Sequence, residues 1–181
     1  LKNPVIGSLI EKLLISEYTS YTGVILSTVG SSDQYWHRDT DTLNNTNTNG
    51  GEMVKLNDFY FTCLVPCIVP FNTSNGATEF VAGSHRLAAD EFPHTATTNG
   101  GIKLISEFAS DVPLGSALLF NGKCNHRGTA NNSTADRPAI YTVYHKMWYN
   151  DQYRKGIEWG LCEMNEWVLF VNNCEKNMIL L

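Results

Sequence analysis

The sequence of 181 residues lacks the features that mark two large classes of protein. It has no run of basic residues, and its formal net charge is −5. Because phosphate contacts need a cationic patch, this charge balance argues against a general nucleic-acid binder. No apolar stretch approaches the roughly 18–20 residues of a membrane-spanning helix. We therefore expect a protein that binds no nucleic acid and does not span a membrane.

Cysteine is present, but not in a pattern that builds a disulfide framework or a C-x-x-C motif. The five residues are Cys63, Cys67, Cys124, Cys162 and Cys174. Their odd number predicts reduced thiols and an intracellular, cytoplasmic location. No secretory signal is visible at the start, although the chain begins with Leu1 rather than Met and is expected to be trimmed at its N-terminus.

Helical periodicity is scarce as well. Only residues 4–17 carry apolar side chains at the spacing of an amphipathic helix. The tail over residues 159–181 is rich in apolar and aromatic residues without clear periodicity. We expect a helix there that covers the core or meets another subunit.

β-Branched and aromatic segments dominate instead, separated by turns rich in Gly, Pro and Asn. They predict strands over residues 18–29, 58–70, 78–81, 102–108, 116–121 and 137–148. Pro66 and Pro70 indicate a bulge or a sheet edge in the second of these strands. Polar loops are expected over residues 44–51 and 93–101. Many short strands and one convincing helix predict a single all-β domain over residues 1–181, an antiparallel sandwich or jelly roll with an N-terminal helix.

Two histidines and one aspartate have the spacing of a metal site. His37 and Asp39 form an H-x-D pair, and alternation along a strand directs both side chains to one face. His126 follows after a long β-rich interval, over which a jelly roll can return the chain to the first pair. Two imidazoles and one carboxylate hold a divalent metal and leave positions open, as in non-haem Fe(II) oxygenases. Tyr35 shares the parity of His37 and is expected to line the pocket.

Arg137 lies eleven residues after His126, at the head of the last predicted strand. Its planar guanidinium matches a carboxylate in a bidentate way, which suggests an acid with a second carboxylate, such as 2-oxoglutarate. Tyr141 shares the parity of Arg137 and is expected at the pocket floor. Simpler interpretations stay open: a salt bridge between Arg137 and Asp136, histidines that only cap or pack, and a zinc site with Cys124 as fourth ligand.

Three segments follow one another along the chain: YWHRD at residues 35–39, NGATEFVAGSH at residues 75–85, and GSALLF from residue 115, which leads to His126-Arg127 and Arg137-Pro138. In this order they resemble the W-H-x-D, N-G…P-G-S-H and G-D-x-L-x-F…H-R…R-P motifs of the phytanoyl-CoA dioxygenase family of Fe(II)/2-oxoglutarate-dependent oxygenases. The likeness covers roughly residues 18–148.

The resemblance implies a cupin-like double-stranded β-helix with Fe(II) on His37, Asp39 and His126. It implies that Arg137 binds the far carboxylate of 2-oxoglutarate and that O2 is the oxidant. The implied activity is hydroxylation of a small organic substrate with release of succinate and CO2. Oligomeric state does not follow from the sequence.

One departure from the family pattern concerns the co-substrate. Gly128 stands where some members place a serine that helps to bind 2-oxoglutarate, and Thr62 is the expected substitute. Two other functions stay open: a catalytically silent module of the same fold that binds metal or 2-oxoglutarate, and a cupin-type metalloenzyme that does not use 2-oxoglutarate.

Overall fold

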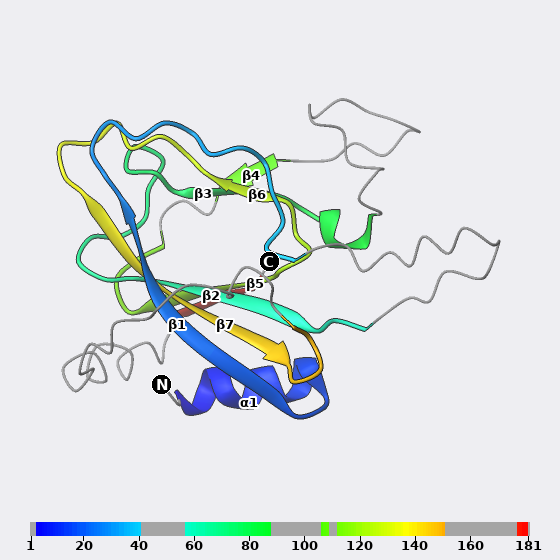
Figure 1. The fold of residues 1–181 in the computed structure, drawn as a ribbon. Coiled ribbons are helices and arrows are strands. Elements are labelled where there is room, and N and C mark those ends of the chain that lie inside the picture. Colours follow the sequence, from blue (N-terminus) through cyan, green and yellow to red (C-terminus); the bar gives the residue numbers. More distant parts are fainter. Residues whose placement is uncertain (1–2, 41–56, 88–105, 109–111, 151–176, 181) are drawn as a thin grey trace.

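The computed structural model describes residues 3–40, 57–87, 106–108, 112–150 and 177–180, whose strands form two sheets (Figure 1). The larger sheet has the order β1-β7-β2-β5-β8 and the smaller sheet the order β4-β3-β6. The bounds are β1 (Tyr18–Ser27), β2 (Tyr60–Pro66), β3 (Thr78–Val81), β4 (Ser106–Phe108), β5 (Ser116–Asn121), β6 (His126–Gly128), β7 (Arg137–Lys146) and β8 (Asn177–Leu180). Neighbouring strands are antiparallel, except β5 and β8, which are parallel.

Helix α1 (Pro4–Leu14) covers the outer face of the larger sheet (Figure 1). Asn3 caps it, because its side-chain oxygen accepts hydrogen bonds from two amides of the first turn at 2.9 and 3.1 Å. The helix ends three residues before the predicted end, at Leu14. There Ile15 takes a left-handed conformation with a φ of 57°, and its amide bonds back to the carbonyl of Glu11.

Successive side chains along a strand point to opposite sides of the sheet, and strands β2 and β5 are buried on both faces, whereas β1 is partly exposed. The outer face packs against α1 in a cluster that includes Ile6, Ile10, Leu14, Phe61, Cys63, Val65, Ile140 and Tyr144. The inner face is directed toward the smaller sheet. The hydrophobic cluster between them includes Leu64, Phe71, Phe80, Leu118, Phe120 and Ala139. The candidate site residues therefore belong to the inner face and to the segments that cross it.

Most strand predictions are confirmed, with β3 and β5 at the predicted bounds. The sequence predicted a bulge or a sheet edge near Pro66. The prediction of an edge is wrong, because β2 lies between β7 and β5. Pro66 is the last residue of that strand, so the strand stops four residues early. The predicted helix in the tail is wrong for residues 177–180, which form β8. The loops predicted at residues 44–51 and 93–101 lie outside the described residues.

Two facing sheets with a helix on the outside confirm the prediction of an all-β jelly roll, the double-stranded β-helix, with an N-terminal helix. In the part of the chain that the structure describes, no helix has the length and apolar character needed to cross a membrane. Cys63, Cys67 and Cys124 are buried and form no disulfide.

Candidate metal centre and its cavity

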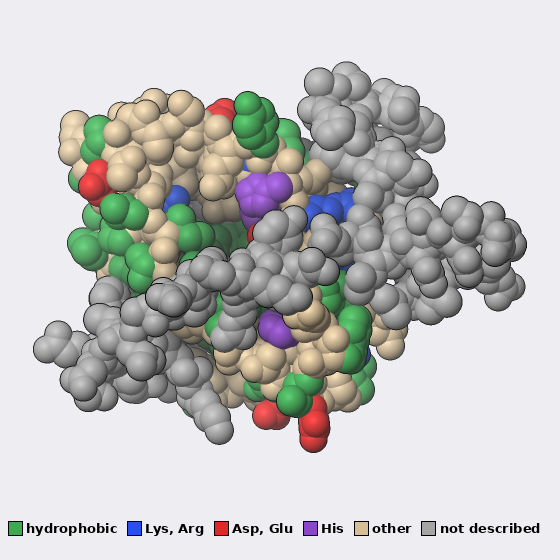
Figure 2. Space-filling model, viewed as in Figure 1, with side chains coloured by type: hydrophobic (Ala, Val, Ile, Leu, Met, Phe, Trp, Pro, Cys, Tyr) green, Lys and Arg blue, Asp and Glu red, His purple; other side chains and the backbone are tan. Residues whose placement is uncertain are grey.

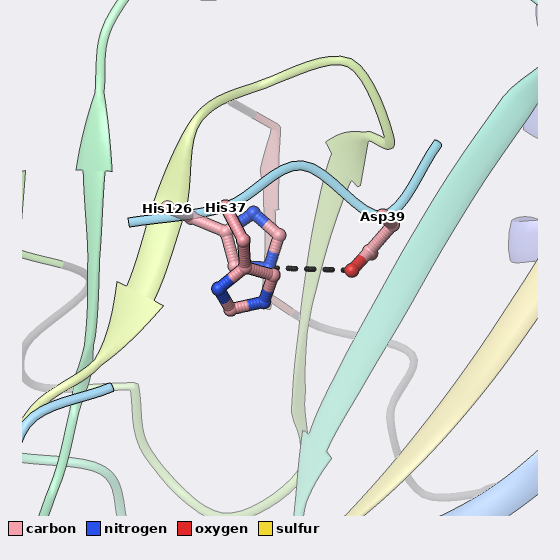
Figure 3. Close-up of side chains that lie close together, drawn as sticks. All are labelled: His37, Asp39 and His126. Atoms are coloured by element: carbon pink, nitrogen blue, oxygen red, sulfur yellow. Dashed lines mark ion pairs between the residues drawn. The ribbon is translucent and has the colours of Figure 1, made fainter. Parts of the chain in front are cut away.

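Backbone pairing brings the two histidines together. His37 and His126 face each other in an antiparallel bridge in which each amide donates to the carbonyl of the other residue, both at 2.9 Å. Their rings lie with centroids 4.4 Å apart (Figure 3). The pairing explains how residues 89 positions apart in sequence reach one site, since 126 − 37 = 89.

The segment before His37 is fastened to β6 and to the residues after it. The amide of Gln34 donates to the carbonyl of Gly128 at 2.8 Å, and the amide of Gly128 donates to the Gln34 side chain at 2.7 Å. Arg127 adds an ion pair with Asp33 at 3.2 Å and stacks over the ring of Trp36 with its central carbon 4.8 Å from the ring centroid. His37 is therefore positioned by a segment with several fixed points.

Each imidazole uses one nitrogen on a backbone carbonyl two residues earlier. Nδ1 of His37 lies 2.9 Å from the carbonyl of Tyr35, and Nδ1 of His126 lies 3.0 Å from that of Cys124. Because a carbonyl only accepts, Nδ1 is the donor in each of these contacts, which leaves Nε2 of each ring as the atom that can bind a metal. Such a second contact commonly sets the tautomer of a metal-binding histidine.

Asp39 is held on two sides. Its amide donates to the carbonyl of Gly122 at 2.9 Å, and its Oδ2 accepts a hydrogen bond from the Thr62 hydroxyl at 2.6 Å. Its other oxygen, Oδ1, lies 3.5 Å from Nε2 of His126 (Figure 3). Gly122 has no room for a side chain, because a Cβ there would collide with the ring of Tyr60.

The three side chains form a compact ligand set. One ligand atom from each of His37, Asp39 and His126 lies within 4.8 Å of the others. Burial lowers the pKa of His126 below its ordinary 6.5, an effect that the Asp39 carboxylate opposes and His37 reinforces. His126 is therefore neutral at pH 7, as a metal ligand must be. Two imidazole nitrogens and a carboxylate oxygen are the donors that suit Fe(II) in an open facial site.

Cys124 does not belong to this set. Its thiol packs in the core within 3.6 Å of the Ser84 hydroxyl and of the Val81 carbonyl. Burial raises the pKa of this thiol, and among the described residues the group of metal-binding side chains is His37, Asp39 and His126, without Cys124. The structure therefore gives no support to the four-ligand zinc site.

Arg137 is buried at the start of β7, with a side-chain orientation set by a turn in another part of the chain. Its Nε donates to the carbonyl of Asn75 at 3.0 Å and its Nη2 to that of Gly76 at 2.6 Å, while the guanidinium lies over the ring of Phe71 at 4.8 Å. Asp136 bonds instead to the amide of Val29 at 2.9 Å. The alternative of an Arg137–Asp136 salt bridge is wrong.

The Asn75-Gly76 turn thus has a structural role that its sequence motif did not reveal. The Asn75 amide group donates to the carbonyl of Pro70 at 2.9 Å and its oxygen accepts from the amide of Asn72 at 2.9 Å. Gly76 has a φ of +82°, and a Cβ there would lie 2.5 Å from the Ser27 hydroxyl. Only glycine therefore allows the turn to present its carbonyls to Arg137.

A cavity of about 650 Å³ lies between the two sheets, and its lining includes the two histidines, Asp39, Thr62 and Arg137. Tyr141 also lines it, as predicted. The prediction for Tyr35 is wrong: its side chain is 94% exposed and lies outside the cavity lining. Thr62 lines the cavity, but its hydroxyl donates to Asp39.

Sequence reasoning missed several polar residues of the cavity lining, among them Ser27, Ser31 and Gln34. Ser27 pairs with Arg137 across β1 and β7, and its hydroxyl lies 3.3 Å from that of Ser31. The side chain of Gln34 fills the space beside Gly128, where an added Cβ would lie 2.8 Å from its Oε1. Only the pairing register of β1 with β7 identifies Ser27 as a neighbour of Arg137, and that register is not evident from the sequence.

The fold and the site define a double-stranded β-helix protein with two histidines and one carboxylate in the lining of a cavity. Residues 8–139 match the phytanoyl-CoA dioxygenase family, and the chain belongs to this family. The match includes His37, Asp39, His126 and Arg137, all of which lie within these bounds.

Two curated proteins are similar to the chain. The uncharacterized protein YJR154W of Saccharomyces cerevisiae is 31% identical over 112 residues, which cover 62% of this chain and 30% of that protein. The Fe(II)/2-oxoglutarate-dependent dioxygenase nvfF of Aspergillus novofumigatus is 28% identical over 138 residues, covering 74% and 41%. The chain thus spans less than half the length of these relatives.

Solved structures share the fold at low sequence identity. The non-haem α-ketoglutarate-dependent epimerase SnoN from nogalamycin biosynthesis has a TM-score of 0.60 at 22% identity, covering 80% of this chain and 56% of that one. HygX from Streptomyces hygroscopicus, solved with nickel and 2-oxoglutarate bound, has a TM-score of 0.53 at 16% identity, covering 81% and 65%.

Proposed function

We propose that the chain is the oxygenase domain of an Fe(II)- and 2-oxoglutarate-dependent dioxygenase. The observation that carries this proposal is the ligand set of His37, Asp39 and His126, whose donor atoms lie within 4.8 Å of one another in the cavity that also holds Arg137. Membership of the phytanoyl-CoA dioxygenase family and the similarity to a fungal Fe(II)/2-oxoglutarate-dependent dioxygenase support it.

The residues divide between metal and co-substrate. The Nε2 atoms of His37 and His126 and the Oδ1 atom of Asp39 would hold Fe(II). Iron in such a site, together with 2-oxoglutarate and O2, supplies the oxidant for attack on a C–H bond and yields succinate and CO2. Thr62 holds Asp39 in the orientation that directs Oδ1 toward His126.

Arg137 would bind the far carboxylate of 2-oxoglutarate. Two of its nitrogens are engaged with the Asn75-Gly76 turn, while Nη1 makes no hydrogen bond among the described residues. The buried cation therefore has donor capacity left for an anion in the cavity. The hydroxyls of Ser27 and Ser31, at the same end of the cavity, are the further contacts that we assign to this carboxylate.

Hydroxylation of a small organic molecule is the outcome that we propose. Similar folds occur in an epimerase and a carbocyclase, each α-ketoglutarate-dependent, so the fold by itself does not select the outcome. The cavity lies between the sheets and has the size of a small-molecule site, which favours a small molecule over a macromolecule. The buried cysteines without disulfides agree with the proposed intracellular location.

The first test is an anaerobic titration of the Fe(II)-loaded protein with 2-oxoglutarate, followed through the visible metal-to-ligand charge-transfer band. We expect the band in the unchanged protein and its loss in Asp39→Ala. Arg137→Lys keeps the charge but loses the planar fork, and we expect the dissociation constant of 2-oxoglutarate to rise by about 10- to 100-fold. Arg86→Lys, an exposed arginine in the 3-10 turn η1 (Ser84–Arg86), is the matched control.

The two remaining alternatives give different results in this experiment. A cupin-type metalloenzyme would bind Fe(II) without the charge-transfer band. A silent module would show the band but would release no succinate when O2 and a broad panel of substrates are added. Unchanged 2-oxoglutarate affinity in Arg137→Lys would contradict the role given to that residue.

A further inference from the structure

The cavity has two ends with different side chains. The pairing register of the larger sheet shows how far apart these ends lie. Arg137 and its partner Ser27 lie at one end of the β1–β7 pair. Six residues further along β7, Val143 pairs with Tyr21 of β1 and with Thr62 of β2. Since a strand rises about 3.3 Å per residue, Arg137 and Tyr21 are on the order of 20 Å apart along the sheet.

The end away from Arg137 is lined by tyrosines and aliphatic side chains. The hydroxyls of Tyr21 and Tyr60 lie 3.0 Å apart, and the ring of Tyr141 packs edge-on to that of Tyr21 with centroids 6.3 Å apart. Val143, Phe120 and Leu64 are the apolar lining residues at this end, because they pair with Tyr21, Thr62 and Tyr141, whereas Val24, Ile25, Leu26 and Ala139 lie along the sheet toward Arg137. This end therefore offers hydrophobic contact and phenolic oxygens.

The charged side chains of the described lining make their hydrogen bonds to groups other than the three tyrosines. Asp39 belongs to the metal set, and Arg137 lies at the other end of the cavity. The guanidinium of Arg38 donates through Nη2 to the carbonyls of Ser84 (3.0 Å) and Leu87 (3.3 Å) rather than to a tyrosine, and its Nη1 is buried without a hydrogen-bond partner among the described residues. A charged group of a substrate would meet no unbalanced opposite charge beside the tyrosines, because Asp39 and the near carboxylate of 2-oxoglutarate would balance the charge of a divalent metal, and its desolvation there would be costly.

The size of the cavity allows a second ligand beside the co-substrate. Its volume of about 650 Å³ is within the range of sites that enclose drug-sized molecules. A five-carbon diacid such as 2-oxoglutarate, held between the metal set and Arg137, leaves room beside the three tyrosines. The lining residues Val24, Ile25 and Leu26 of β1 are 58%, 43% and 55% exposed, so the mouth of the cavity, its exposed rim along β1 between the tyrosine end and Ser27, is apolar as well. Figure 2 shows hydrophobic side chains beside a hollow between the sheets.

We propose that the tyrosine end, formed by Tyr21, Tyr60 and Tyr141, binds a neutral and largely apolar substrate that carries a hydroxyl group. This inference rests on the proposed oxygenase function and names the substrate class of that site. The phenolic oxygens accept a hydrogen bond from the substrate hydroxyl, since a phenol that already donates still has acceptor capacity. The aliphatic residues of the lining and of the mouth contact the apolar body.

Tyr141 sets the width of this end. Its ring lies directly over Gly23 of β1, where an added Cβ would lie 2.5–2.6 Å from three atoms of the phenol. A side chain at position 23 must therefore push the ring of Tyr141 out of its place. Gly23→Ala therefore tests the shape of the tyrosine end, because it displaces the ring of Tyr141 without removing any of the three phenol groups.

The test uses two probes of nearly the same shape, 1-naphthol and 1-naphthoate, with binding measured by calorimetry on the protein loaded with Zn(II) and 2-oxoglutarate. Zn(II) accepts the same donors and performs no redox chemistry. We expect 1-naphthol to bind at least about 10-fold more tightly than 1-naphthoate. Tyr60→Phe and Tyr141→Phe should each weaken 1-naphthol binding by about 3- to 10-fold, the effect of one hydrogen bond.

The control is Tyr144→Phe, a buried tyrosine of the same strand β7 that faces helix α1. It should bind 1-naphthol as the unchanged protein does, whereas Gly23→Ala should bind it several-fold more weakly. Thermal unfolding of each variant shows whether the fold is kept. All variants should bind 2-oxoglutarate equally, since the changed residues lie away from Arg137.

The outcomes separate the two proposals. If 2-oxoglutarate binds but 1-naphthoate binds as tightly as 1-naphthol, or neither probe binds, the substrate class is wrong and the oxygenase function stands. Equal loss of 1-naphthol binding in Tyr144→Phe and Tyr60→Phe also overturns the tyrosine site. Failure of 2-oxoglutarate to bind the metal-loaded protein overturns the proposed function itself, whatever the naphthyl probes do.

Discussion

The contact between Thr62 and Asp39 gives a prediction in which two roles for Thr62 have opposite consequences. The Thr62 hydroxyl donates to Oδ2 of Asp39 at 2.6 Å, a short bond to a charged group. Thr62→Val keeps the shape of the side chain and removes this donor. If Thr62 positions the carboxylate, the change weakens metal binding and leaves the intrinsic affinity for 2-oxoglutarate nearly unchanged.

The magnitude follows from the surroundings of the carboxylate. A hydrogen bond to a charged group contributes about 1.5–3 kcal/mol when both partners are buried. The Asp39 side chain is 22% exposed, so water partly replaces the lost donor and the lower end of that range applies. About 1.5 kcal/mol corresponds to a loss of metal affinity of roughly 10-fold. Removal of a contact that orients a metal ligand typically lowers metal affinity or activity by about 10- to 100-fold.

The assay is anaerobic competition for Fe(II) against a chromophoric chelator, followed by 2-oxoglutarate titration at saturating metal. Thr62→Ser retains the hydroxyl and should restore metal affinity to within about 2- to 3-fold, which a merely structural loss of the threonine would not do. Unchanged metal affinity together with weakened 2-oxoglutarate binding in Thr62→Val would refute the positioning role and return Thr62 to the co-substrate.

Three further changes test the supports of the site. Because burial lowers the pKa of His126, this residue takes up a proton at higher pH in the unfolded chain than in the folded one. The free energy of unfolding of the metal-free protein, measured in urea, should therefore decrease from pH 6.5 toward pH 5, and it should decrease less steeply in His126→Gln. Arg127→Met removes the ion pairs with Glu79 (2.7 Å) and Asp33 and should cost about 2–4 kcal/mol in urea unfolding; a loss below 0.5 kcal/mol would contradict this support. Gly76→Ala should weaken 2-oxoglutarate binding at least 10-fold, because the turn that orients Arg137 needs a positive φ at residue 76. Calorimetry on the metal-loaded protein measures this affinity. Gly83→Ala, a change at another glycine with a positive φ, is the control.

The residue types of the site could be predicted from sequence because they need only local rules and approximate spacing. His37 and Asp39 are adjacent on one face in any extended segment, and a jelly roll returns the chain to them at His126. The structure brings these three together. The same rule failed for Tyr35, because residues 31–36 follow an irregular path and only His37 forms a bridge. Period-two alternation holds within strands and not along the segments that lead into them.

Contacts that depend on the packing of distant segments could not be predicted. The hydroxyl of Thr62 was expected at the co-substrate, yet the crossing of residues 37–40 over β2 brings Asp39 to it first. Pro66 has the sequence character of an edge residue, but the strand order places β2 inside the sheet. The tail residues 177–180 become a strand only because β5 offers them a partner.

Glycines explain why short motifs in this chain carry more structural information than their few letters suggest. Gly76 lets a turn approach Ser27 and offer its carbonyl to Arg137, while Gly122 lets the segment of Asp39 approach Tyr60. Neither glycine touches a ligand in the proposed site, yet each determines where a functional side chain lies. The N-G motif at Asn75-Gly76 is therefore part of the arginine site, although it lies 61 residues before Arg137. A substitution at such a glycine should change ligand affinity while every catalytic side chain remains in the sequence, which is the outcome that Gly76→Ala and Gly23→Ala are designed to show.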